Sequence, residues 1–334
     1  MKAAILVKPG DLRFDDIAQP LPLAGEVRIK LKATGICGSD VHFFKGDRPL
    51  AKPTIIGHEG LGMIDMLGEG ARSLQLGQRV VIEPNIPCFA CSQCLQGRGN
   101  ICSNKRVIGL TENGCFAEYI CVPAAFCHPV PDTVSDADAV TVEPLAVAYH
   151  ALFKTHAKPG DTIAVVGLGA IGLLLTQLAI ALGYRVIVTE LMENKRQMAI
   201  DMGAMATDAN SKADGIASYW LRMGVMAVFE CSGVAEVASL VTDCAPRCSQ
   251  IVLLGLSEKL ASFQPLKLAR EGIDLIGSII YQHPFDFKRV LYLVEKGVIH
   301  PGKIISQNMA FENIRQAFEL ALQGSHSKIV IQIS

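Results

Sequence analysis

The chain has 334 residues, of which 31 are basic and 32 acidic, giving a net charge of −1, and half of its residues are hydrophobic. This balance provides no long-range attraction to nucleic acid or to an anionic membrane, and the length is sufficient for two domains with substantial cores. The first apolar run is too short for a secretory signal peptide and lacks a cleavage pattern. The eleven cysteines therefore favour metal binding over disulfides, and we expect a cytoplasmic protein.

The first 60 residues combine short strands with two chemically active segments. Residues 1–35 alternate apolar runs with turn sequences, which predicts strands and turns. The segments G-I-C-G-S-D-V-H and I-I-G-H-E-G then supply potential metal ligands and proton carriers, namely Cys37, Ser39, Asp40, His42, His58 and Glu59. A thiolate, an imidazole and a carboxylate are compatible with an open zinc site that leaves a fourth position for water or substrate. Cys37 or His58 alone would be more typical of a buried core residue, and their local contexts favour the metal site.

A loop containing prolines and glycines carries four cysteines at C-x2-C-x2-C-x7-C spacing, at Cys88, Cys91, Cys94 and Cys102. Four thiolates from one loop are typical of a closed, tetrahedral structural zinc site. An iron–sulfur cluster and disulfides or free thiols are the alternatives. The usual clustered ferredoxin run has a shorter last gap and a following proline, whereas Ser103 follows the last cysteine here. We therefore predict structural zinc.

Two segments link the cysteine loop to the centre of the chain. Residues 109–128 predict a β-hairpin, in which Cys115, Cys121 and Cys127 lack ligand spacing and are interpreted as small apolar residues. Further on, Glu143 precedes a proline and an apolar helical run, so it is expected at a helix entrance that faces a domain junction. By itself such a glutamate is more typical of a first-turn charge favoured by the helix dipole.

The most informative stretch starts with a short apolar strand over residues 162–166. It leads into three glycines at G-x-G-x-x-G spacing, Gly167, Gly169 and Gly172, and then into a helix over residues 170–182. The glycines allow a tight turn, a close approach of the backbone to a pyrophosphate and close packing of the helix on the strand. A second strand ends on Glu190, where an acid would bind a ribose 2′-hydroxyl. A membrane span over this stretch is rejected, because glycines interrupt the apolar run and no basic flank accompanies it.

Beyond Glu190 the alternation of strands and helices continues. Helices are predicted over residues 193–202 and 234–244, and strands over residues 227–230, 250–254 and 274–280. Such alternation indicates a parallel, doubly wound sheet. The final stretch predicts helices over residues 285–296 and 313–322 and a last strand over residues 328–333.

Five motifs in this order, C-G-S-D-V-H, G-H-E, the cysteine loop, E-P-L-A-V-A and V-V-G-L-G-A-I-G, make the chain resemble the zinc-containing medium-chain dehydrogenase/reductase family over essentially its whole length. Through G-H-E and E-P-L it is similar to the polyol, sorbitol dehydrogenase-like branch, and less closely to threonine and butanediol dehydrogenases. The resemblance implies a Rossmann-type α/β domain at residues 147–283. It also implies a mostly β, GroES-like catalytic domain, formed by residues 1–146 and a return segment, residues 284–334.

The resemblance assigns roles to the candidate residues near the N-terminus. The catalytic zinc would be held by Cys37, His58, Glu59 and, directly or through water, Glu143. Asp40 matches a carboxylate that orients the histidine ligand. Ser39 matches the hydroxyl that passes the alcohol proton toward solvent, and His42 either continues this relay or lies on the surface. With the cysteine loop, two zinc ions are expected per chain.

The same resemblance implies that the dinucleotide is bound by Gly167, Leu168, Gly169, Ala170, Ile171, Gly172, Glu190 and Lys195. The charge of Glu190 would repel the 2′-phosphate of NADP, which favours NAD. Against this, Lys195 and Arg196 could screen such a phosphate if their side chains turned inward.

The expected reaction is hydride transfer between NAD and a secondary alcohol, such as a polyol, sugar alcohol or sugar acid. Phe43 stands where the polyol branch often has tyrosine, and Ile279-Ile280-Tyr281 where it often has Arg-Tyr, which leaves the particular alcohol open. A small-molecule alcohol is the expected partner, and a homodimer or homotetramer is expected from the resemblance. A non-catalytic nucleotide-binding relative and an electron-transfer protein built on the cysteine loop are the rival hypotheses.

Overall fold

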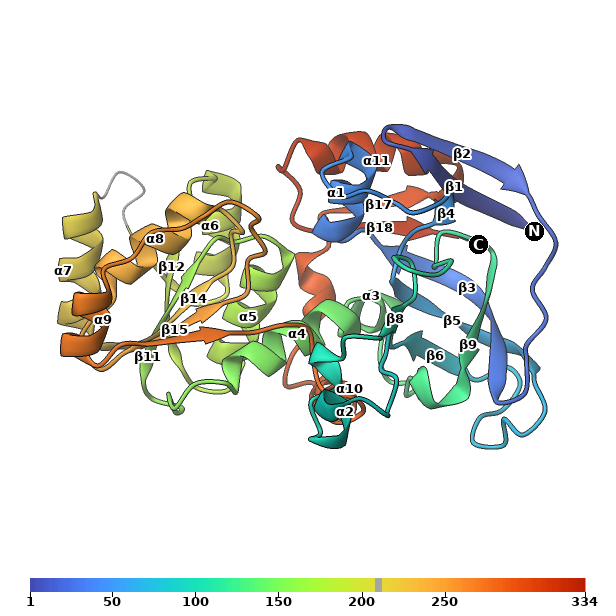
Figure 1. Ribbon diagram of the computed structural model, residues 1–334, viewed down its shortest axis with the longest axis horizontal. Coiled ribbons are helices and arrows are strands. Elements are labelled where there is room, and N and C mark those ends of the chain that lie inside the picture. Colours follow the sequence, from blue (N-terminus) through green and yellow to red (C-terminus); the bar gives the residue numbers. More distant parts are fainter. Residues whose placement is uncertain (208–211, 334) are drawn as a thin grey trace. The chain divides into compact units, whose positions relative to one another are not determined.

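The computed structural model describes residues 1–207 and 212–333. The chain forms two compact units, one from Met1–Glu143 together with Gln282–Ser334, and one from Pro144–Tyr281 (Figure 1). Among the described residues, no helix has both the length and the apolar character needed to cross a membrane.

The unit of residues 144–281 is built on a parallel sheet of six strands in the order β13-β12-β11-β14-β15-β16. The strands are β11 (Thr162–Val166), β12 (Arg185–Thr189), β13 (Met205–Ala206), β14 (Val225–Glu230), β15 (Gln250–Leu253) and β16 (Asp274–Gly277). The chain runs outward from β11 through β12 to β13 and then returns to place β14 on the other side of β11. This reversal is the position where Rossmann-type sheets bind dinucleotides, at the carboxyl ends of the strands.

The helices of this unit are α4 (Val142–Leu152, which begins in the other unit), α5 (Ala170–Ala181), α6 (Glu193–Asp201), α7 (Ala213–Met223), α8 (Ala235–Cys244) and α9 (Pro265–Glu271). All five residues of β11 are buried, as expected for a central strand covered on both faces. The predicted doubly wound sheet is confirmed. The last strand ends at Gly277 and is shorter than the predicted residues 274–280, and α7, α9 and β13 were not predicted.

The unit formed by the two chain ends is rich in strands. Its strands are β1 (Lys2–Lys8), β2 (Asp11–Asp16), β3 (Glu26–Gly35), β4 (Thr54–Ile55), β5 (Glu59–Leu67), β6 (Arg79–Ile82), β7 (Asn85–Ile86), β8 (Arg106–Val107), β9 (Tyr119–Pro123), β10 (Cys127–Pro129), β17 (Gln307–Ala310) and β18 (Ile329–Gln332). They form sheets in the orders β2-β1-β4, β7-β8 and β10-β6-β5-β3-β18-β17, with β9 also paired to β3. The C-terminal strands β17 and β18 thus complete a sheet begun by the N-terminal part of the chain.

The helical segments of this unit are short. They are α1 (Gly38–Lys45), α2 (Ser92–Leu95), α3 (Asp136–Val140), α10 (Phe285–Glu295), α11 (Ile314–Leu322) and the 3-10 turns η1 (Gly99–Ile101), η2 (Ala124–Phe126), η3 (Pro301–Ile304) and η4 (Phe311–Asn313). The strands over residues 1–35 and the two C-terminal helices and last strand agree with the predictions from the sequence.

The hairpin predicted over residues 109–128 is wrong. The strand β9 pairs with β3, and β10 pairs with β6, so the two strands of this segment do not pair with each other. The preceding residues pack as a loop against Gly57: a Cβ atom added to Gly109 or Gly114 would come within 2.1 or 2.2 Å of the Gly57 carbonyl oxygen. The segment does contain a strand, β9, but its partner β3 lies far away in the sequence.

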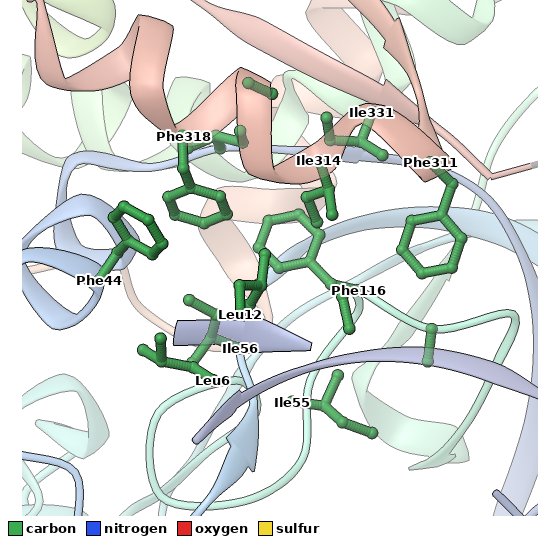
Figure 2. Close-up of a cluster of buried hydrophobic side chains, with 14 of the residues drawn as sticks. Leu6, Leu12, Phe44, Ile55, Ile56, Phe116, Phe311, Ile314, Phe318 and Ile331 are labelled. Atoms are coloured by element: carbon green, nitrogen blue, oxygen red, sulfur yellow. The ribbon is translucent and has the colours of Figure 1, made fainter. Parts of the chain in front are cut away.

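A buried apolar cluster ties the chain ends together (Figure 2). The α11 residues Ile314 and Phe318 point from their helix toward Phe116, and the Phe318 ring stacks on Phe44 of α1 with centroids 4.9 Å apart. The Phe116 and Phe318 rings meet edge to face at 5.7 Å. Because Phe44 lies on α1, this cluster fixes the helix that begins next to Cys37. The core therefore anchors one wall of the first candidate site.

Candidate functional site

The first candidate site is assembled by the register of three neighbouring strands. Gly35 at the end of β3 is paired with Glu59 of β5 on one side and with Val330 of β18 on the other. A Cβ atom at Gly35 would lie 1.9 Å from Glu59 Oε2, so only glycine leaves room for this carboxylate to lie across the strand. Lys328 directly precedes β18, and its Nζ donates hydrogen bonds of 2.7 Å to both Glu59 oxygens.

The resulting ion pair is buried. The side chains of Lys328 and Glu59 are 2% and 0% exposed, and Lys328 Nζ also donates to the Ile36 carbonyl at 3.1 Å. Burial lowers the pKa of Lys328, but the charges of Glu59, Cys37 and Glu143 outweigh this effect and raise it. The lysine therefore stays positively charged and balances an otherwise anionic site. A carboxylate offers about four lone-pair directions, and Lys328 uses two, so Glu59 retains acceptor capacity for a metal ion.

Cys37, His58 and Glu59 come together as predicted, with their potential ligand atoms all within 4.8 Å of one another. Asp40, which is fully buried, accepts a hydrogen bond from Cys37 N at 2.9 Å and one from Gly57 N at 3.2 Å. Its Oδ1 lies 3.3 Å from His58 Nδ1, so Nε2 remains the nitrogen for a ligand. A carboxylate behind a ligating imidazole is the usual arrangement at protein zinc sites, and this set fits zinc.

The electrostatics of the site agree with cation binding. Burial lowers the pKa of His58, but the neighbouring charges of Asp40 and Cys37 raise it well above its usual value. The imidazole is thus surrounded by negative groups that would stabilise a cation. Ser39 Oγ lies 3.4 Å from His58 Nε2, which places a hydroxyl beside the ligand nitrogen.

Two further residues assigned to this site, Glu143 and His42, lie outside the Cys37–His58–Glu59 group. Glu143 is buried in the first turn of α4, at the predicted helix entrance, but it does not belong to the group whose ligand atoms lie within 4.8 Å. His42 is on the exposed part of α1, and its Nδ1 lies 3.0 Å from Asp47 Oδ2. The structure therefore places His42 at the surface, in contact with Asp47.

The four cysteines of the loop form the second group, and they also fit zinc. The sulfur–sulfur distances are 3.4 Å for Cys91–Cys94, 3.8 Å for Cys91–Cys102 and 4.0 Å for Cys88–Cys94. Tetrahedral coordination with zinc–sulfur bonds of about 2.3 Å requires separations of about 3.8 Å. The Cys94 amide lowers the pKa of Cys91 to about 6, whereas burial and Cys91 raise the pKa of Cys94 to about 12. The thiols compete for ionisation, and a cation would allow all four to become thiolates.

The remaining cysteines of this part of the chain behave as apolar residues. Cys115 and Cys127 belong to a buried hydrophobic cluster. Burial raises the pKa of Cys115 to about 12 and that of Cys121 to about 11, and it also raises the pKa of Cys127. These thiols are therefore protonated and unsuited to metal binding.

The third group is the glycine-rich turn between β11 and α5. Gly167 has a φ of +90°, and a Cβ there would lie 2.8 Å from Ser232 N, so this turn requires glycine. A Cβ at Gly172 would come within 2.0 Å of the Gly167 carbonyl oxygen, which shows the close packing of helix on strand. Gly169 has no atom within 4 Å of an added Cβ. The first and third glycines serve the turn and the packing, and the second leaves room for a pyrophosphate at the start of α5, with Leu168, Ala170 and Ile171 between them.

Glu190 is held at the end of β12 by three backbone amides. Its Oε2 accepts from Leu168 N at 2.7 Å, and its Oε1 accepts from Leu191 N at 2.8 Å and Met192 N at 2.9 Å. The carboxylate is thus attached to the glycine-rich turn itself. Of the two nearby cations, Lys195 is buried and Arg196 is paired with Glu193 within the same helix.

Three contributors to these sites were not predicted from the sequence. Lys328 and Gly35 act through strand pairing, and no local motif marks them. Ser232 lies next to Gly167 because β14 neighbours β11, and it donates its amide to Glu230 Oε1 at 2.7 Å. The Cys-Ser-Gly sequence after a predicted strand was a weak signal for a second turn at the same sheet edge.

A four-thiolate loop, a Cys-His-Glu group and a glycine-rich turn at the switch point of a Rossmann sheet define a zinc-type, nucleotide-dependent oxidoreductase. Residues 23–132 match the alcohol dehydrogenase GroES-like domain, and residues 170–296 match the zinc-binding dehydrogenase domain. The chain belongs to the zinc-containing medium-chain dehydrogenase/reductase family of alcohol and polyol dehydrogenases.

Similar proteins support this assignment along the whole chain. The starvation-sensing protein RspB of Escherichia coli K12 is 32% identical, with 96% of this chain and 95% of RspB aligned. The sorbitol dehydrogenase of Halalkalibacterium halodurans is 31% identical, with 99% of each protein aligned. The crystal structure of an RspB alcohol dehydrogenase from E. coli CFT073 with NADH has a TM-score of 0.93 and 28% identity, covering 100% of this chain and 99% of that one.

Proposed function

We propose that this chain is an NAD-dependent zinc dehydrogenase that oxidises a secondary alcohol of a polyol, sugar alcohol or sugar acid. The convergence of Cys37, His58 and Glu59, with ligand atoms within 4.8 Å of one another, is the observation that carries the proposal. Three protein ligands are typical of a catalytic zinc site, because the fourth position has to stay available for substrate. The similarity to a sorbitol dehydrogenase over the full chain supports the polyol class.

In this mechanism the protein residues orient the ligands and move the proton. When bound, zinc would polarise the alcohol and lower the pKa of its hydroxyl, and the nicotinamide would take the hydride. Asp40 orients His58 through Nδ1, and Lys328 holds both oxygens of Glu59. Ser39 Oγ holds the proton of the alcohol and passes it toward solvent, since it lies 3.4 Å from the ligand nitrogen.

The choice of NAD rests on Glu190. Its three backbone hydrogen bonds keep the carboxylate at the strand end, beside the turn that would receive the pyrophosphate. A ribose diol can donate to the remaining lone pair of Oε2, whereas a 2′-phosphate would add negative charge at the same place. Arg196, one of the two cations that could screen such a phosphate, is paired with Glu193 within the same helix.

A substrate panel tests the proposal. Sugar alcohols, aldonates, threonine and butane-2,3-diol are each offered with NAD and with NADP, and nicotinamide reduction is followed by absorbance. We expect turnover with a polyol or sugar acid and NAD, and its loss in Cys37→Ser, which removes one ligand. A preference for threonine or butanediol would show that the proposed substrate class, polyols and sugar acids, is wrong. Absence of turnover with every alcohol in zinc-loaded protein would contradict the proposed activity.

A further inference from the structure

A third group of metal-ligating side chains lies within the unit formed by the chain ends. Glu83 directly follows β6, His128 lies in β10, and His283 precedes α10. Glu83 Oε2 is 2.7 Å from His128 Nε2 and 2.8 Å from His283 Nδ1, and the three ligand atoms form a compact group. None of these residues belongs to the two candidate zinc sites. The group joins the start of Gln282–Ser334, the C-terminal part of this unit, to two strands from the N-terminal part of the chain.

The carboxylate of this group has an unused ligand atom. Glu83 is fully buried, and its Oε1 has no hydrogen-bond partner among the described residues. Both side chains that contact Glu83 Oε2 are histidines, and no lysine or arginine among the described residues forms a salt bridge with this carboxylate. A buried carboxylate requires pairing or a metal ion, because its transfer from water is costly. The situation differs from that of Glu59, whose two oxygens share a buried lysine.

Each of the two imidazole rings stacks on a different phenylalanine ring. The His283 ring stacks on Phe126 with centroids 4.3 Å apart, and the His128 ring stacks on Phe287 at 4.8 Å. The Glu83 amide donates to the Phe126 carbonyl at 2.8 Å, which continues the pairing of β6 with β10. The side chain of His283 is 18% exposed and provides access from solvent. The ligand set is therefore largely preorganised, which reduces the entropic cost of binding.

We propose that Glu83, His128 and His283 bind a divalent cation of the zinc class at a third, thiolate-free site. Two imidazole nitrogens select zinc-like transition metals over magnesium and calcium, and a His2Glu set with one open position is a common zinc arrangement. Zinc–nitrogen bonds of about 2.0–2.1 Å place tetrahedral ligands roughly 3.3 Å apart, so the nitrogen and oxygen atoms separate by roughly 0.5 Å on binding. Through His283, the bound ion links the start of Gln282–Ser334 to β6 and β10.

Cobalt(II) is the probe that separates this site from the other two. Each of those contains at least one cysteine, so cobalt bound there shows a sulfur-to-cobalt charge-transfer band in the near ultraviolet, whereas cobalt held by Glu83, His128 and His283 shows only weak d–d absorption. Protein loaded with two equivalents of zinc per chain, enough for the two cysteine-containing sites, is titrated with cobalt, and total metal per chain is measured together with the spectrum. We expect wild type to take up one further equivalent without the thiolate band.

Two variants of the site and one matched control complete the experiment. Glu83→Gln and His283→Asn should lose the further equivalent, and the second, at a partly exposed residue, keeps the test valid if the first does not fold. His156→Asn removes an exposed histidine from the other unit and should retain it. Cobalt should also raise the melting temperature of wild type and His156→Asn but not of His283→Asn. Equal uptake by wild type and His283→Asn, or no further uptake by wild type at about 100-fold excess cobalt, would overturn the third site and leave a hydrogen-bonded cluster in its place.

Discussion

The two candidate zinc sites in the unit formed by the chain ends differ in how far apart in the sequence their residues lie. The four cysteines belong to one loop, residues 88–102, and its helix α2 buries none of its residues. The Cys37 group instead combines the start of α1, the start of β5 and Lys328, which is 269 positions from Glu59 in the sequence. A metal would have to organise the cysteine loop, whereas the sheet and the apolar core already organise the Cys37 group. Removal of each metal should therefore have different consequences.

The largest expected effect is on the cysteine loop. Cys94→Ser should yield unstable or insoluble protein, because structural zinc sites can contribute roughly 10 kcal/mol or more of apparent folding free energy. Cys37→Ser should give folded protein without turnover, since Asp40 and the strands remain in place. Circular dichroism, soluble yield and zinc content are compared, with exposed Cys248→Ser as the control. Fully active wild type with one zinc ion or none would show that the two-site assignment is wrong.

A smaller loss of stability is expected at the Lys328–Glu59 ion pair of the Cys37 group. Lys328→Met should lower the free energy of unfolding by about 3–5 kcal/mol, because it leaves the Glu59 carboxylate buried without its partner. Adding Glu59→Gln should recover part of this loss, since it removes the unpaired charge. Urea denaturation measures both, and Lys30→Met, at an exposed lysine in β3, is the control. A loss below about 1 kcal/mol for Lys328→Met would mean that the pair does not hold the site together.

The same contrast explains which features could be predicted from the sequence. The geometry of the cysteine loop and of the glycine-rich turn depends on residue spacing within a short segment, so both could be predicted from the sequence. Lys328 and Gly35 contribute only through the register of β3, β5 and β18, which a single sequence does not reveal. The group of Glu83, His128 and His283 was missed for the same reason.

The fold shows a similar division. The predicted doubly wound sheet followed from uniformly apolar strands such as β11, all of whose residues are buried. Two helices of this unit were not predicted: α7, which buries only Ile216 and Trp220, and α9, which buries none of its residues. The false hairpin over residues 109–128 contained a real strand, but its partner was distant. Local periodicity therefore gave the element type and not its pairing.

A further test of the Cys37 group concerns transfer of the alcohol proton through Ser39. Ser39→Ala should lower kcat by about 10²–10⁴-fold, because it removes the hydroxyl beside the ligand nitrogen of His58. Cofactor affinity should be unchanged, and Ser39→Thr, which keeps a hydroxyl, should retain much of the activity. A deuterium isotope effect on the substrate establishes that hydride transfer limits the rate. Unchanged turnover under that condition would remove Ser39 from the proposed mechanism.

The smallest expected effect lies in the other unit and concerns cofactor choice. Glu190 is fixed by Leu168 N, Leu191 N and Met192 N, so its charge cannot easily leave the position where a 2′-phosphate would bind. Two unit charges 4 Å apart repel by about 1 kcal/mol in bulk water and about 4 kcal/mol at an effective dielectric of 20. Since Glu190 is half-buried, an intermediate value applies, and we expect wild type to prefer NAD by about tenfold or more.

Glu190→Ser tests this assignment, because it removes the charge and keeps a small polar side chain. The ratio of kcat/KM for NAD to that for NADP should fall by about tenfold, chiefly through improved use of NADP. Glu193→Ser is the matched control, since it removes a nearby carboxylate that does not contact the glycine-rich turn and releases Arg196 from its ion pair. If Arg196 screened the phosphate, this control would shift the ratio more than Glu190→Ser does. A wild type that prefers NADP, or a ratio unaffected by Glu190→Ser, would show that cofactor choice is made elsewhere.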